Sequence, residues 1–404
     1  MNHHRNALPG AEAGGDHAYF SPVLGGPLFR LFCRTHLSTD ELLLLRRRIV
    51  AVVFITWLPL LVLAIVEGKV MGDGVAMPFF HDFAVHARFL VALPLLFVAE
   101  FVAHQRLRPV VKAFEARSLI PADARERFDA ALGSAFRARN SVFAELVIIA
   151  LVYGVGLLLV WQQFVMIEGN TWFSEGPTGG VEPSMAGEWY RYVSLPLFQF
   201  LLLRWYFRVF IWARLMWQVS RIRLCLVPTH PDRAGGLGFL AHSISAFALL
   251  ALAHSVVLAG QLLNRIVHRG ASLPDFALEI GAMVVVLLLL ALAPLAVFAG
   301  QLAQLRRRGL DEYGVLAQHL AGEFDTKWVR GGAPADEPLL GSADISALAD
   351  MGGSYEVIEN MRSVPIAPEA LIPLVVAILL PMLPLTLTMM PLDALVKALV
   401  GLMF

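Results

Sequence analysis

Long apolar blocks alternate with polar segments along this chain. A helix that crosses a bilayer needs about 20 predominantly apolar residues, because each residue advances the helix by only ~1.5 Å. Seven blocks have this character: 49–66, 88–104, 141–163, 192–215, 237–263, 276–303 and 370–390. The pattern predicts an all-α fold, a polytopic transmembrane helix bundle of about seven spans with short cytoplasmic helical segments.

The polar segments divide the chain into four parts. Residues 1–48 form an N-terminal segment without an early apolar run, so we expect the first span to be a permanent anchor rather than a cleaved signal peptide. Residues 49–303 contain six spans and the polar loop 104–140. A helical segment at 304–369 and a proline-rich last span at 370–404 follow.

Composition agrees with a membrane protein and narrows the chemistry. The chain is 57% hydrophobic and only 16% charged, and its 32 basic side chains equal its 32 acidic ones, so no nucleic-acid partner is indicated. The two cysteines, Cys33 and Cys225, are too far apart in sequence for a zinc-ligand pair. No nucleophile set, glycine-rich nucleotide loop or metal-ligand motif appears, so we nominate no catalytic residue, cofactor or metal.

The distribution of basic side chains predicts the orientation in the membrane. Lys and Arg number 23 in one set of alternate segments: 1–48, 104–140, 216–236 and 304–369. They number five in the other set: 67–87, 164–191, 264–275 and 391–404. Because cytoplasmic loops retain positive charge, we expect a cytoplasmic N-terminus and a periplasmic C-terminus.

Four charged side chains interrupt the apolar blocks near their cytoplasmic ends. Glu100 lies in the second block and Glu145 in the third, while Arg204 and Arg208 are one helical turn apart in the fourth. A charge inside a bilayer is costly and usually faces the bundle interior. We therefore expect these four residues to form one network, which is either a structural clamp or part of a conduction path.

A line of polar side chains follows one face of the fifth block. His254, Gln261, Arg265 and His268 are separated by 7, 4 and 3 residues, which is helical spacing. Glu279, from the sixth block, is placed to meet this face. Histidine titrates near neutral pH, so one reading of the line is proton sensing or relay. The alternative is that a backbone carbonyl simply holds His254.

The stretch LVPTHPDRAGGLGFL, residues 226–240, joins the fourth and fifth blocks. Pro228 and Pro231 end the preceding helix, and the glycines permit a tight turn. Its His-Pro-Asp tripeptide also occurs in J-domain cochaperones, but there it lies between two soluble basic helices rather than between apolar spans. No second ligand stands at helical spacing from His230, so a zinc site is not indicated.

The same stretch contains a candidate anion or lipid-headgroup site. It would consist of free backbone amides and the Arg233 guanidinium, with these members: His230, Asp232, Arg233, Gly235 and Gly236. Asp232 would have to face away from the anion, for instance toward Arg221 or Arg223. The alternative is an interfacial turn without a ligand.

Two polar segments outside the spans have helical patterns. In 104–140, one helical face collects Phe128, Ala131, Leu132, Ala135 and Phe136. This segment is either a basic amphipathic helix lying on anionic lipid or a helical extension of the neighbouring spans. The segment 304–369 contains two helical stretches and is too short for a substantial core of its own. We expect it to pack against the spans or against another copy.

The last apolar block is rich in proline. Pro381 and Pro384 lie within one turn and each leaves a carbonyl without its amide partner. In lipid such carbonyls must be satisfied by other groups, and Thr386 and Thr388 supply the local hydroxyls. The block is either a kinked span or a partly re-entrant segment.

Two stretches carry a resemblance to a known family. PTHPDRAGGLGFL and LLGSADISALADMGGSYEVIENMRSVPIAP resemble a family of multi-pass inner-membrane proteins of bacteria, and the likeness extends from about residue 40 onward. The resemblance implies the bacterial inner membrane. It implies no activity, substrate or catalytic residue.

Two functions remain open from the sequence. The first is a channel or transporter for an ion or small solute, with the buried charges along its path. The second is a membrane signalling or scaffold protein that uses the 304–369 segment. A wet cavity running from Glu100 to His254 would favour the first, and a dry bundle with an exposed apolar cytoplasmic surface would favour the second. Expected partners are the lipid bilayer, anionic lipid and a second copy.

Overall fold

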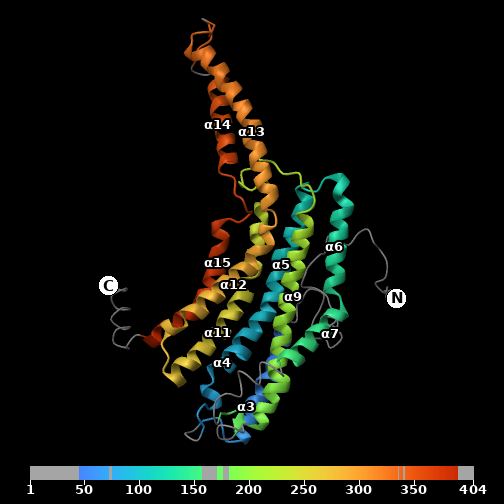
Figure 1. Ribbon diagram of the computed structural model, residues 1–404, viewed down its shortest axis with the longest axis vertical. Helices are drawn as coiled ribbons and strands as arrows, with labels where there is room; N and C mark the ends of the chain where they lie inside the picture. The colour runs from blue at the N-terminus through green and yellow to red at the C-terminus, as the bar shows by residue number, and fades with distance from the viewer. Residues whose placement is uncertain are drawn as a thin grey trace, which may run out of the picture.

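The protein is a helical bundle from which one pair of helices projects (Figure 1). The computed structural model describes residues 45–71, 75–156, 171–175, 182–334, 336–339 and 342–389, and the statements below concern these residues. Apart from helices it contains one short antiparallel pairing, between the two-residue strands β1 (Ser174–Glu175) and β2 (Glu182–Pro183). The expected all-α class is confirmed.

Six helical segments are long and apolar enough to cross a membrane: Leu45–Val66, Phe83–Ala116, Met185–Val219, Gly238–Arg269, Leu273–Ala296 and Pro368–Met389. A seventh span results if the pair Ala122–Arg139 and Val142–Gly156, bent by 48°, counts as one. Six to seven spans agree with the sequence prediction at this level. The last seven residues of the predicted third block, 157–163, lie outside the described residues.

The first three segments comprise several helices each. The elements are α2 (Leu45–Thr56), α3 (Leu58–Val66), α4 (Phe83–His86), η3 (Ala87–Ala92), α5 (Leu93–Ala116), α8 (Met185–Trp189), η6 (Tyr190–Ser194) and α9 (Leu195–Val219). Short turns η2 (Phe79–His81) and η4 (Ala122–Ala124) precede α4 and α6. Pro59, Pro94 and Pro196 are each the second residue of α3, α5 and α9, directly after a turn or a π-helix that interrupts the regular α-helical hydrogen bonds.

The remaining elements follow in chain order. They are α6 (Arg125–Arg139), α7 (Val142–Leu151), η7 (Gly238–Ala241), α10 (His242–Ala246), α11 (Ala248–Arg269), η8 (Leu273–Phe276), α12 (Ala277–Ala296), α13 (Ala299–Phe324), η9 (Asp325–Val329), α14 (Ala343–Glu359), α15 (Pro368–Leu379), η10 (Leu380–Met382), α16 (Leu383–Thr386) and η11 (Leu387–Met389). The predicted block 276–303 extends too far toward the C-terminus, because α12 ends at Ala296. Val297 and Phe298 separate α12 from α13, and hydropathy does not register such a break because both residues are apolar.

Helix α6 stands beside α5 and α9 (Figure 1). Its predicted apolar face is buried against these helices through Phe128, Ala131, Leu132 and Ala135. Phe114 on α5 is 6.0 Å from Phe128, ring centre to ring centre. The interpretation as a helical extension therefore holds, and the interpretation as a helix lying flat on lipid is wrong for this face.

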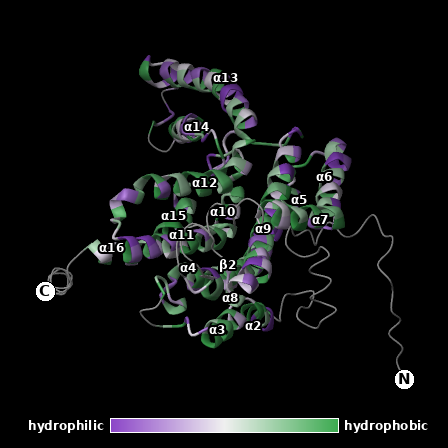
Figure 2. Ribbon diagram, turned by 60° about the horizontal axis from the view of Figure 1, so that its bottom comes forward, coloured by the Kyte–Doolittle hydropathy of each residue, from purple (hydrophilic) through white to green (hydrophobic). Residues whose placement is uncertain are grey.

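Helices α13 and α14 form an antiparallel hairpin that extends away from the bundle (Figure 1). The two helices pack against one another, and at their base the Arg306 guanidinium of α13 donates to the Glu359 carbonyl of α14. The base also contacts the bundle, where Gln301 Nε2 donates to the carbonyls of Ser220 and Ile222 just after α9. Of the two expected arrangements for 304–369, packing against the spans is found only at the base of the hairpin, and packing against another copy stays a prediction. Hydrophilic positions are frequent on α13, whereas α3 is predominantly hydrophobic (Figure 2).

The proline-rich end is a helix interrupted by a tight turn. Pro381 falls in η10 and Pro384 in the first turn of α16. The Thr386 and Thr388 hydroxyls donate to the carbonyls of Leu383 and Leu385. These are not the carbonyls four residues before each proline, so the predicted role of the threonines is wrong. Residues 390–404 lie outside the described residues.

Candidate functional site

The four predicted intramembrane charges meet in the interior of the bundle. Arg208 Nη1 lies 2.7 Å and Arg204 Nη1 3.4 Å from Glu100 Oε1, and Arg204 Nε lies 3.5 Å from Glu145 Oε1. A fifth member, Arg48, places Nη2 2.6 Å from Glu100 Oε2. These five residues are called the charge cluster below, and they connect α2, α5, α7 and α9.

The charge cluster is enclosed by apolar and aromatic groups. Glu100 is 3% exposed, and Arg48 is equally buried. The Arg48 guanidinium lies 5.0 Å from the centre of the Phe97 ring, and Arg208 lies 5.2 Å from that of Trp205. Two carboxylates thus pair with three guanidinium groups in a medium where an unpaired charge would be costly, and the cluster keeps a formal net charge of +1. This geometry is that of a clamp between four helices.

Sequence reasoning missed Arg48. It is the last of three consecutive arginines, Arg46 to Arg48, which resemble a cytoplasmic anchor at the end of the predicted segment 1–48. The chain is already helical from Leu45, and successive helical residues point about 100° apart. Arg48 therefore faces the interior while its two neighbours are exposed.

The backbone amides of the turn at 226–240 donate hydrogen bonds to a carboxylate of the turn itself, that of Asp232. Asp232 Oδ1 accepts hydrogen bonds from the amides of Ala234 (2.8 Å) and Gly236 (3.1 Å), and Oδ2 accepts one from Gly238 (2.7 Å). Positive φ angles at Arg233 (52°), Gly235 (63°) and Gly236 (98°) turn these amides inward.

This arrangement corrects the predicted anion site. The amides that were expected to be free donate to Asp232, and Asp232 faces into the turn rather than toward Arg221 or Arg223. Partial burial opposes ionisation, but the three amides and then His230 outweigh it and hold the pKa of Asp232 below its usual range. His230 Nδ1 lies 2.9 Å from Asp232 Oδ1. The carboxylate of Asp232 thus occupies the place that an external anion would take at these amides.

The same turn contacts the base of the hairpin. The Arg233 carbonyl accepts a hydrogen bond of 2.8 Å from the amide of Arg362, just after α14. A Cβ at Gly309 of α13 would lie 2.8 Å from Pro228 Cβ, so this glycine permits the close approach of the turn. The stretch that the sequence singles out therefore joins the spans to the projecting hairpin.

The predicted polar line along α11 divides into separate interactions. Arg265 Nη1 contacts both carboxylate oxygens of Glu279, at 2.8 and 3.0 Å. His268 Nε2 lies 2.9 Å from the His81 carbonyl. His254 Nδ1 donates to the Leu250 carbonyl at 2.7 Å, so its Nε2 accepts from the Tyr206 hydroxyl. A continuous relay along the helix is not formed.

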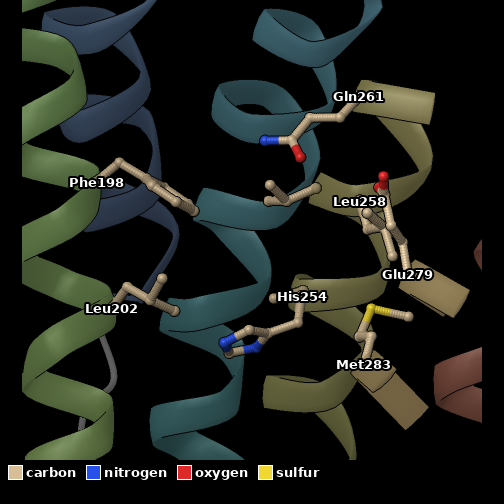
Figure 3. A pocket seen from close by; sticks show the side chains of 9 residues that line it. Phe198, Leu202, His254, Leu258, Gln261, Glu279 and Met283 are labelled. Carbon is tan, nitrogen blue, oxygen red and sulfur yellow. The ribbon is translucent and has the colours of Figure 1, made fainter. Parts of the chain in front are cut away.

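A cavity of about 240 Å³ opens beside this line (Figure 3). Its walls come from α9, α11 and α12, and its polar members are His254, Gln261 and Glu279. None of the five residues of the charge cluster lines it. This cavity therefore does not join Glu100 to His254, the connection that would have favoured a channel or transporter.

A further polar group at the opposite end of the bundle from the hairpin was not predicted. Asp82, 3% exposed, accepts hydrogen bonds from Asn264 Nδ2 (2.8 Å), Trp172 Nε1 (2.9 Å) and the Val85 amide (3.1 Å). Nearby, His86 Nδ1 accepts from Trp57 Nε1, so Nε2 donates to the Phe79 carbonyl. The buried Asp82 ties α4 to α11, and a single acidic residue in a short loop carried no signal for this.

Neither a metal site nor a known relative identifies the function. Among the described residues, no three His, Cys, Asp or Glu side chains are grouped so that they could hold a metal ion. Comparison with protein-family models, curated proteins and solved structures finds no match to this chain. The resemblance to bacterial inner-membrane proteins therefore stays an expectation.

Proposed function

We propose that the chain is a membrane-anchored signalling or scaffold protein whose α13–α14 hairpin binds a protein partner outside the bilayer. The observation that carries this proposal is the hairpin itself. Helix α13 has 26 residues and is about 39 Å long, and much of it extends beyond the other helices (Figure 1). A long helical pair that contacts the bundle only near its base is a suitable platform for another molecule.

The charge of the hairpin favours a basic partner. Over α13 and α14, residues 299–359, the chain carries ten Asp and Glu side chains against five Lys and Arg, a net charge of −5. Three of the five basic side chains, Arg306 to Arg308, lie at the base, so the part beyond them, 309–359, has a net charge of −8. Anionic headgroups repel such a surface within a Debye length, so the hairpin is favoured to stand away from the membrane. A basic protein surface would be attracted to it.

Exposed apolar side chains supply the second requirement for binding. Val315 is 74% and Val329 69% exposed, and Leu316 on α13 is also exposed. Apolar groups on a water-facing acidic helix are candidates for the desolvated centre of an interface. Val329 follows Gly309, the contact with the turn at 226–240, by 20 helical residues, about 30 Å, so lipid at the spans does not account for its exposure.

The bundle would hold the hairpin in place. The turn at 226–240 binds its base through Arg233 and Pro228, and the charge cluster fixes α2, α5, α7 and α9 against each other. With the positive-inside rule, the hairpin would stand on the cytoplasmic side of a bacterial inner membrane, with the N-terminus inside and the C-terminus outside. Ion or solute transport has less support, because the buried charges are paired with each other.

Photocrosslinking in intact cells tests this function. A benzoylphenylalanine at Val315 or Val329 should give discrete adducts with a partner of basic surface, identified by mass spectrometry. The same group at Val286, an exposed apolar position of α12, is the matched control. Replacing Glu312 and Glu323 by lysine should reduce the adducts from Val315.

Two results would overturn the proposal. One is the absence of adducts at both hairpin positions. The other is an ion or solute flux in liposomes containing the purified protein that is lost in Arg208→Gln at unchanged folding. An adduct of two copies of this chain would identify the partner as a second copy.

A further inference from the structure

The cavity between α9, α11 and α12 has an apolar body. Phe198 and Leu202 of α9 face Val257 and Leu258 of α11, and Met283 of α12 closes another side (Figure 3). All three helices belong to segments long and apolar enough to cross a membrane. A molecule that enters this space from lipid would exchange one apolar environment for another and would gain close contacts.

One end of the cavity is polar and accessible. Gln261 and Glu279 line this end, and the side chain of Glu279 is 46% exposed. The Gln261 amide points from α11 toward α9 (Figure 3) and has no hydrogen-bond partner among the described residues. An amide at the edge of an apolar cavity offers both a donor and an acceptor to a ligand.

The charges at this end are already balanced. Arg265 Nη1 lies 2.8 and 3.0 Å from the two oxygens of Glu279. A cationic ligand would compete with Arg265 for the carboxylate, and an anionic ligand would be repelled by it. An uncharged hydroxyl can donate to a remaining lone pair of Glu279 and accept from Gln261 without disturbing the ion pair.

We infer that this cavity binds an uncharged, membrane-soluble amphiphile with a hydroxyl head, held between Gln261 and Glu279, and an apolar body against Phe198, Leu202 and Met283. The volume of about 240 Å³ lies below the ~300–1,000 Å³ of cavities that enclose a drug-sized ligand. The cavity therefore receives the head and the first part of the body, and a longer chain continues along the outer surface of the bundle. A free long-chain alcohol and a diacylglycerol share this chemistry.

Photolabelling of the full-length protein in phosphatidylcholine nanodiscs tests the site. The probe is hexadecan-1-ol carrying a diazirine near its head, and the labelled peptides are identified by mass spectrometry. Label should concentrate on the peptides that contain Phe198 to Leu202 and Ala253 to Gln261. The corresponding diazirine palmitate, which has a charged head, should label these peptides less.

Variants separate binding in the cavity from general contact with lipid. Val257→Trp fills the cavity and should remove most of the label, while Val286→Trp, the same change on an exposed face of α12, should leave it unchanged. Gln261→Leu keeps the size of the side chain and removes the head contact, so labelling at subsaturating probe should fall about fivefold, as expected for one neutral hydrogen bond. The melting temperature of each variant is measured alongside, and Gln261→Leu carries the test if Val257→Trp does not fold.

Competition with unlabelled ligands distinguishes a diacylglycerol from a free long-chain alcohol as the natural ligand. Unlabelled dioleoylglycerol should displace the probe if the site takes glycerolipids, and unlabelled hexadecanol alone should do so if it takes free alcohols. Equal labelling of all exposed spans, or labelling unchanged in both Val257→Trp and Gln261→Leu, would overturn the inference. The cavity is remote from the hairpin, so this result is separate from the outcome of the hairpin crosslinking.

Discussion

Arg208 and Glu100 are 108 residues apart in the chain, and their side chains meet at 2.7 Å inside the bundle. Glu100 also forms ion pairs with Arg48 and Arg204, so one carboxylate contacts three arginines from two other helices. Such a group is costly to bury and costlier to disrupt, because removing one partner leaves the others without compensation. The packing of α2, α5 and α9 therefore depends on Glu100.

Glu100→Gln should be strongly destabilising. The substitution leaves three guanidinium groups around a neutral amide, and breaking a buried pair of this kind costs about 3–5 kcal/mol. We expect a clear drop of the melting temperature in detergent. Glu115→Gln is the control, because Glu115 forms an exposed ion pair with Arg125 and such pairs contribute about 0–1 kcal/mol.

A double variant checks that the residues act together. Glu100→Gln combined with Arg208→Gln should lose less stability than the sum of the two single losses, since the second change removes a charge that the first left unpaired. Strictly additive losses would show that the two side chains do not interact.

The cost of charge in an apolar block made this cluster predictable. Glu100, Glu145, Arg204 and Arg208 stand out because each interrupts a run of apolar residues, and only the bundle interior can accept them. The buried face of α6 was predictable for a similar reason, since helical periodicity alone selects Phe128 and Leu132.

Other features depend on three-dimensional arrangement that no local pattern contains. Arg48 belongs to a polar run, and only the rotation of α2 decides that it faces Glu100. The direction of Asp232 follows from positive φ angles at three nearby residues, including the non-glycine Arg233. The break at Val297 and Phe298 leaves no trace in hydropathy. The hairpin was predicted as two helices, but its projection follows from how α13 leaves the bundle.

Asp232→Asn should weaken the turn at 226–240 in a pH-dependent manner. The substitution removes the charge that three amides share, at a cost of about 1–2 kcal/mol. The pKa of Asp232 is lowered in the folded protein from 3.8, so its stabilising effect is complete above that pH and is lost as the pH falls through the folded-state value. Thermal unfolding between pH 7 and pH 3 should show wild type and variant converging at the acid end. A constant difference would contradict this account.

Lys327→Met should open the tip of the hairpin without affecting the spans. Lys327 Nζ contacts Glu337 Oε1 at 2.6 Å and Asp344 Oδ2 at 2.8 Å, so it joins η9, directly after α13, to the start of α14. We expect faster amide hydrogen exchange at 325–345 and unchanged exchange in α11. The control is Arg330→Met, because Arg330 pairs with Asp325 only five residues away and does not join the two helices. Equal effects of the two variants would argue against a clamp at Lys327.

The orientation can be tested with two single cysteines. After Cys33 and Cys225 are replaced by serine, Met71→Cys places a thiol beyond α3, and Arg127→Cys places one near the start of α6, toward the hairpin. Alternate sequence segments carry 23 and five basic side chains, and position 127 lies in a segment of the basic set. With the protein expressed in bacteria, an impermeant maleimide added to intact spheroplasts should therefore label position 71 and not 127. Labelling of 127 alone would reverse the orientation.

Gly260→Ala and Gly281→Ala should differ although each places one methyl group inside an apolar helix. A Cβ at Gly260 of α11 would lie 2.6 Å from Ala87 Cβ, 3.0 Å from the Phe83 carbonyl oxygen and 3.1 Å from Ala84 Cα. Two of these atoms are backbone, so α11 and α4 would have to separate. Overpacking of this kind typically costs about 1–3 kcal/mol. The separation would also strain the hydrogen bond of 2.8 Å between the Phe83 amide and Asn264 Oδ1.

At Gly281 of α12 no atom lies within 4 Å of the added Cβ, and alanine favours the helix over glycine by up to about 1 kcal/mol. Thermal unfolding in detergent should therefore place Gly260→Ala below and Gly281→Ala at or above the wild type, and equal melting temperatures for the two variants would contradict the close approach of α4 and α11.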